Sequence, residues 1–157
     1  MNINKLASEL AVKLKDSGLT VGSAESLTGG LVAAALTSVP GSSAYFQGGV
    51  VAYSNQLKVE LLGVPVEVLR DFGAVSEECA RAMAEGLRRK LNVRAAVATT
   101  GIAGPDGGAE TKPVGLVWIA ASTGHRTVAV KNLFTGDREA VTRASVDAAL
   151  KLLADII

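Results

Sequence analysis

Cysteine and histidine are almost absent from this sequence, whose 157 residues include one of each, Cys79 and His125. A single cysteine excludes an intrachain disulfide, and the two residues are too few for a Cys/His zinc site within one chain. The acidic residues Glu25, Asp106 and Asp137 show no metal-ligand spacing, so a metal hydrolase has little support and we predict no metal or other cofactor. Chemistry that needs a nucleophile and a base must therefore use His125 or proceed without histidine.

An excess of one charge sign and long apolar runs are missing too. The chain has 16 Lys+Arg against 15 Asp+Glu, a formal net charge of +1. We therefore expect no nucleic-acid partner and no attraction to an anionic membrane, unless a local patch provides it. Apolar runs such as Leu31–Leu36 are too short to span a bilayer, and charges throughout residues 1–20 rule out a signal-peptide core. A cytoplasmic protein is the expectation.

The composition that remains is that of a packed domain. Hydrophobic residues make up 48% of the chain and charged residues 20%. This balance is normal for a folded protein and wrong for a disordered one. The length fits one domain, and neither a repeat nor a linker marks a boundary, so residues 1–157 are expected to form a single domain.

Apolar periodicity alternates between helix and strand along the chain. Helices are predicted at 3–17, from 28–30 to 36, at 55–62, from 65, from 76 to about 91, and from 137 to the C-terminus. Strands are predicted at 19–23, 46–53, 94–99, 116–122 and 126–134. Early strands separated by helices indicate parallel crossovers, while the late pair of strands indicates a hairpin with one antiparallel neighbour. The pattern predicts an α/β fold with a mixed sheet and helices on both faces.

The first candidate segment for function is Ala24–Gly30, where a predicted strand leads into a polar turn and a glycine-opened helix. Ligands of open α/β sheets bind beyond the carboxyl ends of strands, and free N–H groups at a helix start can bind an anion. Ser26 is placed to act there as a nucleophile. The structural alternative is that Ser26 or Thr28 only caps the helix.

The second segment places Lys58 about one helical turn after a strand that ends at Tyr53. Lysine is usually a solvated surface charge, which is one interpretation of Lys58. In the other, burial lowers its pKa and the neutral amine activates a serine.

Two further features lie later in the chain. A glycine-rich loop, 99–108, can bring backbone N–H groups close to a phosphate or a substrate. Arg138 stands in the first turn of the last helix, where the helix dipole disfavours a cation; it is either a surface residue or a ligand for an anion. His125 is interpreted as an exposed turn residue, and Cys79 as core packing.

Several motifs together resemble one family, the nicotinamide-nucleotide amidases, also known as the C-terminal domain of the competence/damage-inducible protein CinA. The motifs occur in the same order and span almost the whole chain. They are AESLTGG at 24–30, PGSSAYFQGGVVAYSNQLK at 40–58, GAVSEE at 73–78, TGIAGPDGG at 100–108, KPVG at 112–115 and GDR at 136–138.

The resemblance implies a three-layer α/β/α sandwich that hydrolyses the carboxamide of nicotinamide mononucleotide, in pyridine-nucleotide salvage. It implies a metal-free serine amidohydrolase with Ser26 as nucleophile and Lys58 as base. By motif, the other residues in or around the site are Tyr53, Thr100, Ser43 and Arg138. The oxyanion and substrate are expected at N–H groups near Thr28, Gly29 and Gly30, or at Gly101.

The resemblance also implies a homodimer. The family usually has cysteine after the nucleophile, where this chain has Leu27; an apolar neighbour should leave the serine chemistry intact. Larger CinA proteins carry a further nucleotide-processing domain, and that activity is not expected of this chain. The alternative to an enzyme is a module that binds a nucleotide without converting it, which has no need of a Ser/Lys pair.

Overall fold

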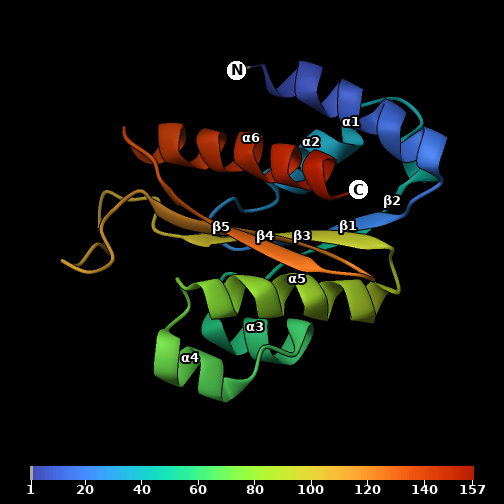
Figure 1. Cartoon of the computed structure of the whole chain (residues 1–157). Helices are drawn as coiled ribbons and strands as arrows, with labels where there is room; N and C mark the ends of the chain where they lie inside the picture. Colours follow the sequence, from blue (N-terminus) through green and yellow to red (C-terminus); the bar gives the residue numbers. More distant parts are fainter. Residues whose placement is uncertain (1) are drawn as a thin grey trace.

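A computed structural model of the chain describes residues 2–157 and shows three layers (Figure 1). The central layer is a five-stranded sheet with the order β2-β1-β3-β4-β5. The strands are β1 (Val21–Glu25), β2 (Phe46–Val51), β3 (Ala95–Gly101), β4 (Leu116–Thr123) and β5 (Thr127–Leu133). β1 pairs in parallel with β2 and β3, and β4 is antiparallel to both of its neighbours. The sheet is therefore mixed with one antiparallel strand, as the sequence predicts.

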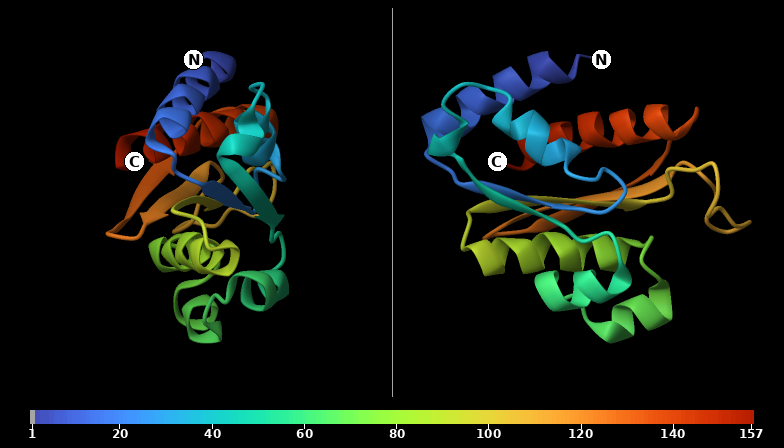
Figure 2. Two further views of the ribbon diagram at one scale, coloured as in Figure 1. Left: turned by 90° about the vertical axis from the view of Figure 1, so that its right-hand side faces the viewer. Right: turned by 180° about the vertical axis from the view of Figure 1, so that it is seen from behind.

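Helices cover both faces of this sheet, as the two further views show (Figure 2). One face carries α1 (Ile3–Ser17), α2 (Leu31–Thr37) and α6 (Arg138–Ile156). The other carries α3 (Asn55–Leu62), α4 (Val66–Phe72) and α5 (Glu77–Leu91). A short 3-10 helix, Ser42–Ala44, precedes β2. None of the described helices is long and apolar enough to cross a membrane.

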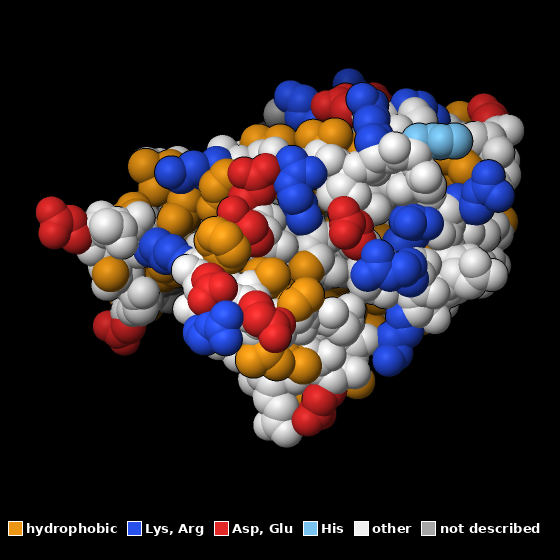
Figure 3. Space-filling view, turned by 60° about the horizontal axis from the view of Figure 1, so that its bottom comes forward, with side chains coloured by type: hydrophobic (Ala, Val, Ile, Leu, Met, Phe, Trp, Pro, Cys, Tyr) orange, Lys and Arg blue, Asp and Glu red, His pale blue; other side chains and the backbone are white. Residues whose placement is uncertain are grey.

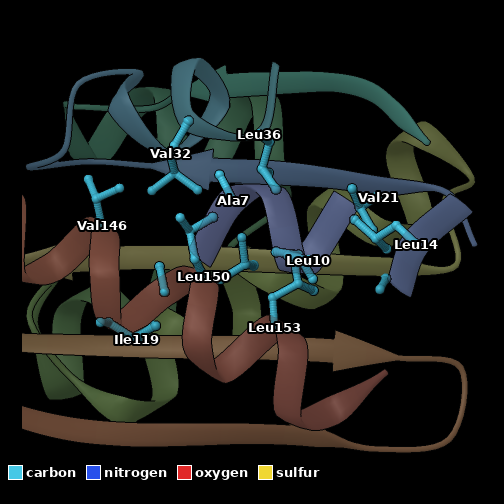
Figure 4. Packing of buried hydrophobic residues seen from close by; sticks show 14 of the residues in the cluster. Ala7, Leu10, Leu14, Val21, Val32, Leu36, Ile119, Val146, Leu150 and Leu153 are labelled. Atoms are coloured by element: carbon cyan, nitrogen blue, oxygen red, sulfur yellow. The ribbon is translucent and has the colours of Figure 1, made fainter. Parts of the chain in front are cut away.

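Two apolar clusters hold the layers together, one on each face of the sheet. The first packs Leu10 and Leu14 of α1 and Leu150 of α6 against Val21 and Ile119 of the sheet (Figure 4). The second packs α5 against the alanine-rich inner strands on the opposite face. Small alanine side chains on β1, β3 and β4 let α5 lie close to the sheet.

Local signals explain where most helices begin and end. Gly18 ends α1 in the left-handed conformation at φ 66°, as predicted, because glycine has no Cβ to clash there. Ser76 and Asp137 cap α5 and α6 through their side chains, also as predicted. The expected hairpin between β4 and β5 is present, with His125 exposed in its turn and Cys79 buried in the core.

Several boundaries differ from the sequence prediction; β3, for example, runs to Gly101 rather than to 99. β1 covers Val21–Glu25 rather than 19–23, since the polar Glu25 is a buried strand residue whose carboxylate has partners at the start of α2. β2 ends at Val51 rather than at Tyr53. α2 begins only at Leu31, and neither Ser26 nor Thr28 is its N-cap.

Candidate active site

Ser26 and Lys58 lie together at the carboxyl end of the parallel strands. Ser26 follows β1 directly, and its N–H donates to Thr99 O of β3 at 3.1 Å, which fixes the turn to the centre of the sheet. Lys58 stands one turn into α3, a helix capped by the side chain of Ser54. Lys58 Nζ lies 3.1 Å from Ser26 Oγ. Two residues 32 positions apart in the chain thus meet at one point.

The Lys58 amine is buried: its residue is 1% exposed. Besides Ser26 Oγ, its Nζ contacts the main-chain oxygens of Ala52 at 2.9 Å and Tyr53 at 3.1 Å. No carboxylate among residues 2–157 forms an ion pair with it. Burial lowers the pKa of Lys58 below the ordinary value of 10.5, and the nearby Cys79 opposes this shift.

Cys79 is not a competing nucleophile. Burial raises the pKa of its thiol to about 11, although Lys58 and Lys112 act in the opposite direction. The thiol is therefore protonated near neutral pH, and a protonated thiol is a poor nucleophile.

Glu25 is the functional residue that sequence reasoning missed. Its carboxylate is 1% exposed and accepts backbone N–H groups of Gly30 at 3.2 Å, Val32 at 2.8 Å and Ala33 at 3.0 Å. It also accepts the Thr28 hydroxyl at 2.7 Å. An internal carboxylate thus occupies the start of α2, just before the turn that carries Ser26. The signal was an acidic residue at the end of an apolar strand, immediately before a polar turn.

The expectation that Gly29 and Gly30 offer free N–H groups to a substrate is therefore wrong. Gly29 N–H donates to Ser26 O at 3.1 Å, and Gly30 N–H donates to Glu25. Gly29 and Gly30 instead allow the main chain to form the tight turn before α2, where their φ angles are 59° and 102°. The Thr28 side chain is equally occupied, between Glu25 and Thr99 Oγ1 at 2.8 Å.

Other N–H groups remain around Ser26. Within residues 2–157, the N–H groups of Leu27 and Thr28 make no hydrogen bond. The N–H group of Gly101 is a third candidate. Alternate residues of an antiparallel strand direct their N–H groups to opposite sides of the strand. Ile102 N–H donates toward β4, so Gly101 N–H points the other way, toward Ser26 at the end of β1. These groups are the available donors for a developing negative charge.

Thr100 and Tyr53 are near the pair but do not touch it through their side chains. The Thr100 hydroxyl donates to Ala74 O at 2.7 Å, in the segment before α5. Tyr53 offers Lys58 its main-chain oxygen, while its hydroxyl accepts from Arg138 Nη2 at 2.9 Å. The tyrosine hydroxyl is thus directed away from the Lys58 amine.

Arg138 connects three segments at the exposed hydroxyl end of Tyr53, which we call the mouth of the site. Besides Tyr53, its guanidinium reaches Gly104 O at 2.7 Å, in the loop after β3. It also lines a cavity of about 670 Å³ between α1, α2 and α6, which is mostly apolar and which neither Ser26 nor Lys58 lines. Arg138 therefore stands between the buried pair and an open groove.

Ser43 lies elsewhere. It is exposed, in the 3-10 helix before β2, at the amino end of the parallel strands. Ser26 stands at their carboxyl end, so the six residues of β2 separate the two serines along the sheet. A single chain does not bring Ser43 into the site. Residues 2–157 likewise contain no group of three or more His, Cys, Asp or Glu side chains placed to hold a metal ion.

Known proteins share both sequence and fold with this chain. A protein of Pseudomonas putida named nicotinamide-nucleotide amidohydrolase PncC is 49% identical over 148 residues, which cover 94% of this chain and 92% of that protein. A CinA-like protein of Chloroherpeton thalassium is 48% identical over 92% of this chain but only 35% of its own length. The chain thus spans about a third of the length of several curated relatives it matches.

Solved structures of similar proteins have the same fold as this chain. The crystal structure of the competence/damage inducible protein CihA from Agrobacterium tumefaciens has a TM-score of 0.95 at 41% identity, covering 98% of this chain and 94% of that one. A CinA superfamily protein from Escherichia coli has a TM-score of 0.96 at 33% identity, covering 99% and 91%. The sequence profile of the CinA C-terminal domain matches residues 3–157. The chain therefore belongs to the CinA C-terminal domain family.

Proposed function

We propose that this protein hydrolyses the carboxamide of nicotinamide mononucleotide to nicotinate mononucleotide and ammonia, with Ser26 as nucleophile and Lys58 as base. The observation that carries the proposal is the 3.1 Å contact between Ser26 Oγ and the buried Lys58 amine. The name of the Pseudomonas putida relative supports the same substrate class.

Burial of Lys58 favours its neutral form, the amine that accepts a proton. A neutral amine has two N–H groups and one lone pair. Lys58 Nζ donates to the main-chain oxygens of Ala52 and Tyr53 and to Ser26 Oγ. In the proposed reactive form the amine is neutral: the two main-chain oxygens keep its N–H groups, and its lone pair accepts the Ser26 hydroxyl proton. Because burial lowers the pKa of Lys58 below 10.5, more of this amine is neutral at a given pH and able to take the Ser26 proton.

The reaction then proceeds by acyl transfer. Ser26 Oγ attacks the carboxamide carbon as its proton passes to Lys58, and the carbonyl oxygen becomes an oxyanion. The N–H groups of Gly101, Leu27 and Thr28 are the proposed donors to this oxyanion. Lys58 returns the proton to the departing nitrogen, ammonia leaves, and a water activated by the same amine hydrolyses the acyl-enzyme. The positive pyridinium ring of the substrate makes its carboxamide more electrophilic.

Arg138 is the proposed ligand of the substrate phosphate. It stands at the mouth of the site with part of its guanidinium uncommitted, and its fork geometry suits a phosphate. A surface of balanced charge makes a local ligand necessary: basic and acidic side chains are interspersed on the α3–α5 side of the molecule (Figure 3). We extend the proposal to a cytoplasmic homodimer. Sedimentation of the purified protein tests the dimer.

Ammonia release by purified variants tests the reaction. Ser26→Ala and Lys58→Met each remove one partner, and we expect each to lower kcat at least about a thousandfold, since paired groups act as a unit. Ser8→Ala and Lys90→Met, both at exposed positions, are the matched controls and retain activity. Near-wild-type turnover in either site variant would exclude the Ser/Lys pair.

The same experiment addresses a binding module without catalysis. If the wild-type protein binds nicotinamide mononucleotide and leaves it unconverted, the module replaces the enzyme as the function. Omitting the phosphate or the ribose from the amide offered then defines what the site binds.

A further inference from the structure

Tyr53 contacts the proposed base with one end and the proposed phosphate ligand with the other. Its main-chain oxygen lies 3.1 Å from Lys58 Nζ, and its hydroxyl lies 2.9 Å from Arg138 Nη2. The residue directly follows Ala52, whose oxygen is the second acceptor of the Lys58 amine. It directly precedes Ser54, the N-cap of the helix that carries Lys58. Tyr53 thus links the two groups within one residue: its hydroxyl contacts Arg138 and its main-chain oxygen contacts Lys58.

Hydrogen-bond capacity is left over at this contact. A guanidinium has five N–H groups. Arg138 uses two of them within residues 2–157, one on Gly104 O and one on the Tyr53 hydroxyl. The tyrosine hydroxyl accepts from Arg138 and has a proton of its own, for which no acceptor lies within reach among the same residues. A phosphate oxygen at this position would accept from both side chains at once.

The Tyr53 ring depends on this contact for its position. The residue is 56% exposed, so packing alone does not fix it. The chain on its amino side is fixed, because Ala52 N–H donates to Glu25 O at 2.8 Å. A ligand that holds the hydroxyl therefore restricts the part of the main chain that includes the Lys58 acceptor.

We propose that Tyr53 couples phosphate recognition to the catalytic base. This inference rests on the proposed function and deepens it. The Tyr53 hydroxyl completes the phosphate site with Arg138, and the bound phosphate, through Tyr53, fixes the main-chain acceptor that aligns the Lys58 amine. Tyr53 is a positioning residue for Lys58 as well as a specificity residue. A substrate with the phosphate therefore reacts faster once bound, besides binding more tightly.

Steady-state kinetics on two substrates test the coupling. Wild type and Tyr53→Phe are assayed for ammonia release from nicotinamide mononucleotide and from nicotinamide riboside, which lacks the phosphate. Phenylalanine keeps the ring and the main-chain oxygen and removes only the hydroxyl. Arg143→Gln is the control for a change of surface charge. Arg143 is an exposed residue of α6, the helix that also carries Arg138, and it pairs with Glu139.

We expect the wild-type kcat for the mononucleotide to exceed that for the riboside by about tenfold or more, the usual scale for an interaction used in the transition state. In Tyr53→Phe, kcat for the mononucleotide falls by about the same factor, while kcat for the riboside stays within about twofold of the wild-type value. Arg143→Gln leaves both values unchanged. The split between substrates separates coupling from a general structural defect.

Two results would overturn the inference while leaving the proposed function intact. One is an equal loss of kcat for both substrates in Tyr53→Phe. The other is a rise of KM for the mononucleotide at unchanged kcat, which indicates uniform binding only. A wild-type protein that releases ammonia from neither substrate would instead remove the proposed function, and the coupling with it.

Discussion

Glu25 places a buried carboxyl group directly beside Ser26, the proposed nucleophile. Such burial is costly unless hydrogen bonds replace the lost water, and here the N–H groups of Gly30, Val32 and Ala33 and the Thr28 hydroxyl replace it. The partial positive charge at the start of α2 contributes further. The single carboxylate thereby fixes both the helix and the turn that presents Ser26.

Glu25→Gln should destabilise the protein although it barely changes the shape of the side chain. The amide presents an NH₂ group to backbone N–H donors, so at least one donor loses its acceptor in the interior. We expect a loss of about 2 kcal/mol in the free energy of unfolding, the scale of a hydrogen bond to a charged group. Urea unfolding at neutral pH measures it. Glu139→Gln, at an exposed position, is the control, and equal stability of the two variants would contradict this role for Glu25.

How much of the site could be predicted depends on where each partner lies in the chain. Ser26 and Lys58 follow the ends of neighbouring parallel strands, so topology and motif together predict that they meet. The role of Glu25 is easily missed, because its one local signal, an acidic residue between an apolar strand and a polar turn, also fits a solvated carboxylate. The direction of the Tyr53 hydroxyl could not be predicted either, since its partner Arg138 is 85 residues away.

At the scale of elements, α3 and α5 approach each other unusually closely at Gly86. A Cβ built on Gly86 would lie 1.8 Å from Leu62 O, at the last residue of α3. The absence of a side chain on α5 thus lets the helix that carries Lys58 rest against it. Helix propensity alone disfavours glycine at this position, so the tertiary contact accounts for it.

Gly86→Ala therefore should destabilise the protein, even though alanine favours a helix by about 1 kcal/mol over glycine. The new methyl group meets backbone, which must shift, and overpacking of this kind costs about 1–3 kcal/mol. Because α3 must move, we also expect reduced ammonia release as the Lys58–Ser26 contact lengthens. Gly124→Ala provides the comparison, since no atom lies within 4 Å of a Cβ there. A Gly86→Ala protein with higher stability than wild type would refute the steric role.

Element types were more predictable than element ends. Helices such as α1 and α5 carry their own caps, so their bounds follow from sequence. The sequence pattern places β1 two residues too early because Glu25 looks like a loop residue until its partners at the start of α2 are known. The start of α2 was misjudged for the same reason: its cap comes from Glu25, several residues upstream, rather than from the adjacent Thr28.

At the scale of the whole molecule, the lowered pKa of Lys58 gives activity a defined dependence on pH. The neutral amine is the reactive form, so kcat/KM should rise with pH through one ionisation whose apparent pKa lies below 10.5. The pH–rate profile measures this. Lys58→Arg cannot deprotonate at these pH values and should stay inactive throughout; recovery of activity in that variant would exclude Lys58 as the base.

The contribution of Lys58 to stability should also rise with pH over this range. The unfolded chain binds a proton at Lys58 with a pKa near 10.5, while the folded protein binds it only at lower pH. Between the two pKa values Lys58 is more protonated in the unfolded state, so its contribution to the free energy of unfolding rises with pH. Urea unfolding of wild type and Lys58→Met across this range isolates the contribution, which the variant should lack. A difference between them that is constant with pH would contradict the shift.

Ser26 and Lys58, the proposed nucleophile and base, belong to parts of the sheet with different protection from solvent. Ser26 extends from β1, which has a strand on each side, whereas the chain reaches Lys58 from β2, the last strand of the sheet. Edge elements open more readily than central ones, so brief local opening of β2 and α3 would separate the pair while the core stays folded. The proposed activity should then decline on warming ahead of global unfolding.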